Sequence, residues 1–288
     1  MLFYGLSMDL AQFQSPDFAG VISSRAICQI LNDKSPSTVG LFVKGKTLEL
    51  IGWEGIAPNY EHTFSSGAVE PGILYKSPKM HVLAVSPRFL ESRETKEIVG
   101  NYETPEGRKL YAELGDAVTL RSFYMLYLVG EKNETLHKVP LILSIHGVAA
   151  ARFGEAYKQF RTRMEIAYAN AMNFGYRSLN DRFHCLTVFN PTFKPSLEPP
   201  NGAKKSWVAV PENVACPKVD VKDFDKFICL NKSQELWAIA ATSIGFANQL
   251  LKASDSEELP APPQVRELVP QTIETTAVSA LTTDEIPY

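Results

Sequence analysis

The chain has 288 residues, with 29 lysines and arginines against 32 aspartates and glutamates, so its formal net charge is -3. A nucleic-acid-binding domain is usually basic, and the whole-chain charge taken alone argues against that class. The charge is unevenly placed, because residues 253–288 hold seven acidic residues and one arginine, a net -6. Residues 1–252 then carry 28 basic and 25 acidic residues, a net +3. A mildly basic body with an acidic tail indicates two parts with different partners.

The composition fits a protein with a real core and no membrane segment. Hydrophobic residues make up 45% of the chain, including 16 Phe and 11 Tyr. No stretch reaches the roughly 20 apolar residues of a membrane span, and the first ten residues lack the basic start of a secretory signal. The cysteines form no C-x-x-C pair, so we expect buried thiols and a cytoplasmic protein; they are Cys28, Cys185, Cys216 and Cys229.

Short strands dominate the first half of the predicted structure. After an irregular lead-in over residues 1–20, Val39–Lys44 and Thr47–Ile51 read as a hairpin that turns at Gly45-Lys46. The polar segment Glu91–Asp116 is expected to be mostly loop. Further strands are expected over Gly72–Lys76, Met80–Val85, Leu120–Val129 and Val139–Ser144.

A long helix is predicted from about Val148 to Phe174, because apolar residues recur there at helical spacing: Phe153, Tyr157, Phe160, Met164, Tyr168, Ala171 and Phe174. Strands are expected again over Phe183–Phe189 and Ser206–Val210, around a proline-rich loop. A last helix is predicted over Asn231–Lys252, where Asn231 and Gln234 resemble a capping box.

These elements predict an α+β fold that is rich in strands, an elaborated OB-like barrel with one long helix and a C-terminal helix. Residues 1–252 form the predicted body. Residues 253–281, which are rich in Ser, Glu, Pro and Thr, are expected to be a disordered linker, and residues 282–288 an acidic interaction tip.

The chain ends in Asp284-Glu285-Ile286-Pro287-Tyr288. An aromatic ring beside a terminal carboxylate can dock in an apolar pocket next to a basic residue, while the acidic pair adds steering toward basic partners. Pro287 lowers the entropy lost when such a tip becomes ordered. This pattern predicts a protein-binding tip, although a chance ending of an acidic tail is the alternative.

The tip resembles that of bacterial single-stranded DNA-binding proteins, which end in an acidic run followed by Ile-Pro-Phe. Asp284, Glu285, Ile286 and Pro287 match this pattern, and Tyr288 replaces the phenylalanine. The resemblance covers about the last five residues and implies recruitment of replication, repair or recombination enzymes. The body is far longer than that family's domain; it resembles an uncharacterised family of cyanobacterial proteins in features such as Leu136-His137-Lys138-Val139-Pro140-Leu141, which implies no function.

Single-stranded DNA requires basic groups for its phosphates and aromatic faces on which its bases can stack. The sequence places such residues together in a few strands and in the long helix. For each, core packing or a solvated charge is the competing interpretation. The predicted nucleic-acid-binding residues are Trp53, Tyr75, Lys76, Lys79, Arg121, Tyr124, Arg161 and Arg163.

A phosphate-loop pattern, G-x-x-x-x-G-K-[ST], spans Gly40–Thr47. Such a loop must follow a strand and open a helix so that its amides face the phosphates. Because Leu41, Phe42 and Val43 read as a strand and Thr47 starts a second one, we reject the motif. The histidines show no metal-ligand spacing, and no nucleophile elbow is present.

The sequence therefore predicts a non-enzymatic protein without cofactors that coats single-stranded DNA and recruits DNA-processing proteins through its tip. A homo-oligomer is compatible with this interpretation, and no membrane partner is expected. One alternative is an adaptor of the phage or plasmid type that uses the tip without binding DNA. A phosphate-handling enzyme that uses Lys46 is a third hypothesis.

Overall fold

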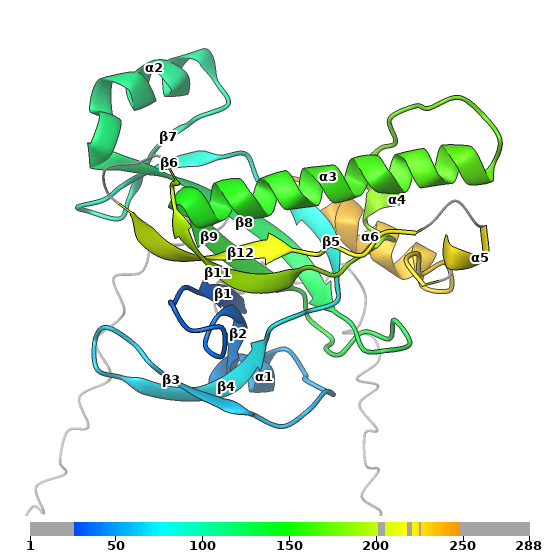
Figure 1. Cartoon of the computed structure of the whole chain (residues 1–288), viewed down its shortest axis with the longest axis horizontal. Helices are drawn as coiled ribbons and strands as arrows, with labels where there is room; N and C mark the ends of the chain where they lie inside the picture. The colour runs from blue at the N-terminus through cyan, green and yellow to red at the C-terminus, as the bar shows by residue number, and fades with distance from the viewer. Residues whose placement is uncertain (1–25, 201–204, 218–220, 225, 248–288) are drawn as a thin grey trace, which may run out of the picture.

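A large, mostly antiparallel sheet forms the centre of the computed structural model, which describes residues 26–200, 205–217, 221–224 and 226–247 (Figure 1). Its strands are β1 (Ile27–Leu31), β2 (Gly40–Lys44), β3 (Tyr60–Thr63), β4 (Val69–Tyr75), β5 (Met80–Val85), β6 (Phe89–Ser92), β7 (Ile98–Asn101), β8 (Val118–Leu128), β9 (Leu141–His146) and β10 (Val188–Phe189). A separate antiparallel ribbon consists of β11 (Thr192–Glu198) and β12 (Ser206–Glu212). The expected α+β class is confirmed.

The main path of the sheet runs β10-β5-β8-β9-β1-β2-β4-β3, with β6 added to β8 and β7 to β6. Among the strands of the described residues, only β1 and β9 pair in parallel. Among the described residues the end strands β10 and β3 do not pair with each other, so the sheet is open and the expected OB-like barrel is not closed. Both end strands are short, which limits the unpaired backbone that a sheet edge presents.

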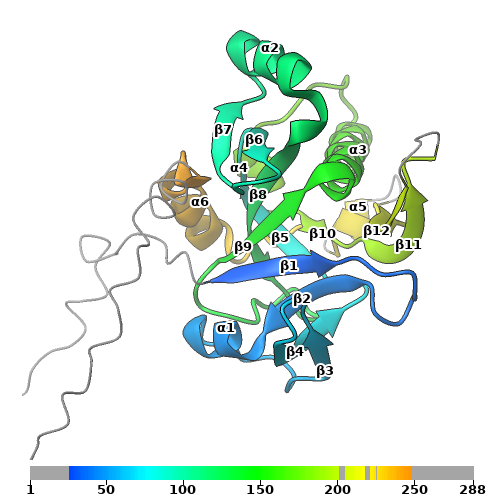
Figure 2. The same cartoon turned by 90° about the vertical axis from the view of Figure 1, so that its left-hand side faces the viewer.

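Helices cover the two faces of the sheet unequally. Helix α3 (Gly147–Ala171) and the β11–β12 ribbon pack on one face, where Leu41, Phe153 and Phe160 lie in the larger core cluster. Helix α6 (Ser233–Thr242) packs on the other face over Leu83 and Met125. The short helix α4 (Asp181–His184) is bound to α3, because Asp181 pairs with Arg161 and His184 with Glu165. Figure 2 shows α3 and α6 on opposite sides of the strands.

The predicted long helix is confirmed as α3, although it begins one residue earlier and ends at Ala171 rather than Phe174. The first four residues of its predicted apolar stripe, Phe153, Tyr157, Phe160 and Met164, are all at most 5% exposed. The last three are less buried, and Phe174 lies beyond the helix. Burying an aromatic or methionine side chain contributes about 1.5–3 kcal/mol, so this stripe anchors the helix to the sheet.

Two parts of the first half differ from the prediction. The expected strand Thr47–Ile51 is the short helix α1 (Gly45–Leu50), which buries Thr47 and Leu48 while Leu50 is 54% exposed. The expected loop over 91–116 contains β7, α2 (Pro105–Leu114) and the 3-10 turn η3 (Gly115–Ala117). Helix α2 has a local cause, because the Thr104 hydroxyl accepts a hydrogen bond from the Gly107 amide at 3.0 Å.

The second half also differs in detail. The strand predicted over Phe183–Phe189 is α4 followed by the two-residue β10, and the proline-rich stretch forms most of β11. Helix α6 follows Lys232 without a side-chain cap, so the capping box predicted for Asn231 and Gln234 is wrong. The short helix α5 (Val221–Phe224) precedes α6. The predicted linker, residues 253–281, and the predicted tip, residues 282–288, lie outside the described residues.

Candidate nucleic-acid interface

A row of aromatic side chains lies on one face of the edge strand β3 and the residue that follows it. Tyr60, His62 and Phe64 alternate along the chain and are half-buried, whereas Glu61 and Thr63 between them are exposed. All three rings pack around the fully buried ring of Phe42 on β2, at centroid distances of 6.0, 5.7 and 6.5 Å. We call Phe42, Tyr60, His62 and Phe64 the aromatic edge cluster.

The cluster depends on a glycine in the strand between its members. Strand β4 separates β2 from β3, and its residue Gly72 pairs with Tyr60 on one side and Lys44 on the other. A Cβ atom at this position would lie 2.6 Å from a ring carbon of Phe42 and 2.3 Å from the Val43 carbonyl oxygen. Because Gly72 has no side chain, the Phe42 ring can lie across β4 and meet Tyr60.

Lys44 supplies a positive charge at the cluster. Its Nζ lies 4.4 Å from the centroid of the Phe64 ring, and no ion pair to it is found among the described residues. Burial, and then the nearby Lys44 charge, lowers the pKa of His62. His62 is therefore neutral at pH 7 and offers a ring face rather than a second charge. Half-exposed rings beside a lysine are the groups with which proteins stack bases and neutralise phosphates.

Four of the predicted residues lie near the β4–β5 turn. Trp53 lies 6.4 Å from Tyr75 and stacks on His137, with centroids 6.0 Å apart and planes 19° apart. Lys76 is exposed, whereas Lys79 is bound to Glu131 at 2.6 Å. Burial raises the pKa of Tyr75 to about 12, so its phenol stays neutral. Tyr75 is three residues after Gly72 and so faces the opposite side of β4 from the aromatic edge cluster.

The predicted arginines are scattered, and two of them are already paired. Arg121 on β8 binds Glu91 and donates to the Ser144 hydroxyl at 3.1 Å. Arg161 on α3 binds Asp181 at 3.0 Å. Arg163 is exposed on α3, on the opposite side of the sheet from Arg121. The described structure therefore does not gather the predicted cations into one groove.

The prediction for Tyr124 is wrong. Its side chain is 4% exposed and lies under α3, with its ring 4.8 Å from that of Phe153. Burial raises its pKa to about 12. A ring enclosed in the core has no face on which a base could stack, so Tyr124 is a core residue.

The prediction missed Tyr60, His62 and Phe64, although the sequence carries a signal for them. In Tyr60-Glu61-His62-Thr63-Phe64 the aromatic rings alternate with polar residues, which is typical of a strand with one ring-bearing face. The predicted partner-binding residues, Asp284, Glu285, Ile286, Pro287 and Tyr288, lie outside the described residues.

The phosphate-loop motif is not a phosphate site. The predicted hairpin is not the reason, because β2 is followed by the helix α1 and not by a second strand. The motif residues Leu41–Val43 are buried within β2, which pairs with β1 on one side and β4 on the other. The backbone is therefore a central strand and not a loop, and the α1 that follows has only six residues. The Nζ atom of Lys46 lies 3.7 Å from the Oε1 atom of Glu70, so this lysine is paired with a carboxylate. No three His, Cys, Asp or Glu side chains gather as metal ligands within the described residues.

All four cysteines are free, and only Cys216 is more than slightly exposed to solvent. Burial raises the pKa of each thiol, as expected for packing residues rather than nucleophiles. No helix in the described part of the chain is both long and apolar enough to cross a membrane.

The fold and surface define an α+β protein with an open sheet whose edge carries aromatic rings. The chain belongs to the family described as "Domain of unknown function (DUF5895)", whose model matches residues 25–258. It is also similar to "Uncharacterized protein 254L" of Invertebrate iridescent virus 6, with 27% identity over 175 residues. That match covers 57% of this chain and 49% of the viral protein, so the chain spans about half the length of that relative. No solved structure matches.

Proposed function

We propose that the protein is a non-enzymatic, cytoplasmic single-stranded DNA-binding protein that recruits replication, repair or recombination enzymes through Asp284–Tyr288. Bases stack on Tyr60, His62 and Phe64, the half-exposed rings of the aromatic edge cluster, and Lys44 neutralises a neighbouring phosphate. The protein uses no cofactor. The observation that carries the proposal is the row of half-exposed rings on β3, with a lysine 4.4 Å from one of them.

The geometry favours a single strand over a duplex. Stacking needs bases whose faces are free, and in a duplex the faces are covered by neighbouring base pairs. A short row of rings on an exposed sheet edge fits a strand laid along β3 or across it. Trp53 and Tyr75, at the other face of β4, and Lys76, which follows this strand, extend the available surface for a DNA strand that bends around this edge.

Fluorescence anisotropy with a labelled oligothymidylate tests the proposal on the full chain. We expect unlabelled single strands to displace the labelled oligothymidylate better than duplexes do, and we expect the affinity to fall as the salt concentration rises. Stacking contributes about 1–3 kcal/mol per base, so Tyr60→Ala and Phe64→Ala are each expected to weaken binding about 5- to 150-fold. Tyr111→Ala, which removes a half-exposed ring on α2, is the matched control and should leave the affinity unchanged. Absence of any preference for single strands, or a flat salt dependence, would refute DNA binding.

A second candidate is an adaptor that uses the tip without touching DNA. It is favoured by the ion pairs of Lys79, Arg121 and Arg161, which occupy three of the predicted DNA-binding cations. The adaptor predicts that Arg161→Gln, Arg163→Gln and Lys44→Gln leave the binding of protein partners unchanged. The DNA-binding proposal predicts that Lys44→Gln weakens binding to oligothymidylate.

A further inference from the structure

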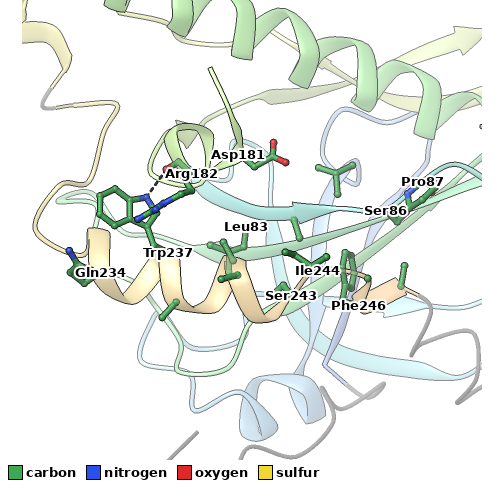
Figure 3. A pocket seen from close by; sticks show the side chains of 17 residues that line it. Leu83, Ser86, Pro87, Asp181, Arg182, Gln234, Trp237, Ser243, Ile244 and Phe246 are labelled. Carbon is green, nitrogen blue, oxygen red and sulfur yellow. Dashed lines mark hydrogen bonds between the residues drawn. The ribbon is translucent and has the colours of Figure 1, made fainter. Parts of the chain in front are cut away.

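An apolar groove of about 770 Å³ lies between α6 and the end of β5. Trp237 of α6 and Ile244, which lies in the turn after that helix, form one wall, and Leu83 and Pro87 lie on the other (Figure 3). Ile244 is 85% exposed, the highest value among the large apolar residues of the described structure. A cluster of exposed apolar side chains in a hollow is a mark of a binding surface.

A second apolar hollow of about 490 Å³ continues this surface toward the end of α3. Arg182 and Trp237 line both hollows, so they stand between the two. Met172 and Leu230, which line the second hollow, are 55% and 68% exposed. We call the two hollows together the α6 groove. Two adjoining hollows suit an extended peptide better than a compact small molecule.

Arg182 gives the α6 groove a positive charge. Its guanidinium lies 4.6 Å from the Trp237 ring, and its carbonyl oxygen accepts a hydrogen bond from the Trp237 indole N–H at 2.7 Å. Stacking leaves the in-plane N–H groups of a guanidinium open to a carboxylate. No ion pair to Arg182 is found among the described residues, and the neighbouring Asp181 is bound to Arg161 at 3.0 Å. The ligand that matches this groove combines a carboxylate with large apolar side chains.

The chain itself contains such a segment. Asp284-Glu285-Ile286-Pro287-Tyr288 has two carboxylates followed by an aliphatic residue, a proline and an aromatic ring. Residues 253–288 carry a net -6 against a body of +3, so the long-range attraction favours contact between them. The charge and the combination of residue types both match the α6 groove.

The connection also favours binding within one chain. Ala247, the last described residue, lines the groove, and residues 248–283 join it to Asp284. At up to roughly 3.3 Å per residue, this connecting segment is long enough for Asp284–Tyr288 to reach any part of the groove. Tethering raises the local concentration of the segment to about the millimolar range, so even a weak contact would be occupied.

We propose that the α6 groove binds Asp284–Tyr288 of the same chain. An acidic side chain of the segment pairs with Arg182, and Ile286 and Tyr288 fill the apolar hollows on either side of Trp237. A protein partner must then compete with the groove for the tip, so the groove regulates when the tip is available. This inference does not require DNA binding, and it can fail without affecting that proposal.

Site-specific photo-crosslinking in the full chain tests the contact. With Ile244→p-benzoylphenylalanine, we expect a crosslink to a peptide within residues 282–288 in a product of monomer mass. The same photo-reactive residue at Val69 on β4, which is 57% exposed, should not reach that peptide. Ile286→Asp should reduce the Ile244 crosslink at least tenfold, because a carboxylate is disfavoured in an apolar hollow.

The charge is tested by Arg182→Gln, which should reduce the crosslink severalfold. Arg177→Gln is the matched control, since Arg177 also lies over a ring, that of Phe174, but does not line the groove. A thermal melt checks the fold of each variant; if Arg182→Gln unfolds, Asp284→Asn with Glu285→Gln tests the same charge from the other side. Crosslinks only to a second copy, only to other segments, or unaltered by these variants would overturn the proposal.

Discussion

Gly72→Ala tests whether the aromatic edge cluster is built as described. The new methyl group would lie 2.3 Å from the Val43 carbonyl oxygen and 2.6 and 2.7 Å from two ring carbons of Phe42. The Phe42 ring is fully buried and the Val43 oxygen belongs to the backbone, so neither can yield without loosening the contact between β2 and β4. Overpacking of this kind costs about 1–3 kcal/mol, and contact with backbone places this variant at the upper end. For a body of this size, about 2–3 kcal/mol lowers Tm by about 4–12 °C.

The assay is a thermal melt of the full chain together with urea unfolding. Gly175→Ala is the control, because a Cβ there meets nothing within 4 Å, and we expect its stability to change by less than about 0.5 kcal/mol. Hydrogen exchange should show faster exchange in β3 for Gly72→Ala, and binding to oligothymidylate should fall as the rings separate. A Gly72→Ala protein that melts like the parent and keeps the parent's exchange in β3 would refute the packing argument.

Three further predictions concern buried groups. Glu165→Gln should lower the free energy of unfolding in urea by about 2–4 kcal/mol, because hydrogen bonds to a charged acceptor contribute about 1.5–3 kcal/mol each. The buried Glu165 carboxylate accepts four hydrogen bonds, including one from His184 at 3.0 Å. A change below about 0.5 kcal/mol would contradict this prediction. Tyr124→Phe should change the free energy of unfolding by less than about 0.5 kcal/mol, because no hydrogen bond of the Tyr124 hydroxyl is found among the described residues. Its affinity for oligothymidylate should stay within about twofold of the parent's. Burial lowers the pKa of His81 and of His137 to about 4, so the unfolded chain binds more protons below pH 6.5 and stability falls as the pH drops. From pH 8 to pH 5 each histidine should remove about 2 kcal/mol, and a urea midpoint that is constant over this range would contradict the burial.

Periodic segments could be predicted from the sequence, whereas short ambiguous ones could not. The run Met80–Val85 coincides with β5, and the apolar spacing of α3 leaves few alternatives over its 25 residues. The run Thr47–Ile51 fits both a strand and a helical turn, because its apolar residues are spaced by two as well as by three. Packing decides between them, since Leu48 and Ile51 are buried and Leu50 is exposed. That information lies in contacts with other elements and not in the five residues.

The candidate site shows the same division. Strand alternation correctly places Phe123 and Tyr127 on one face of β8 and Tyr124 on the other. The sequence of β8 does not show that α3 covers one face and α6 the other, and so it does not predict that Tyr124 is buried. The edge strand β3 has the same mixture of aromatic and polar residues, but no helix covers its rings in the described structure, and they stay half-exposed.

Ion pairing determines what the body's charge of +3 can do. Lys79, Arg121 and Arg161 are each held by a carboxylate, and a phosphate would have to displace that partner. Among the described residues, Lys44 and Lys76 near the aromatic edge have no such partner. These two lysines neutralise about two phosphates, which predicts a salt slope of about -1.4 for single strands. An electrostatic contribution from so few neutralised phosphates gives weak binding, so stacking on Tyr60 and Phe64 has to supply most of the binding free energy. If binding is instead steeply salt-dependent and unchanged by removing these rings, the DNA lies on another surface.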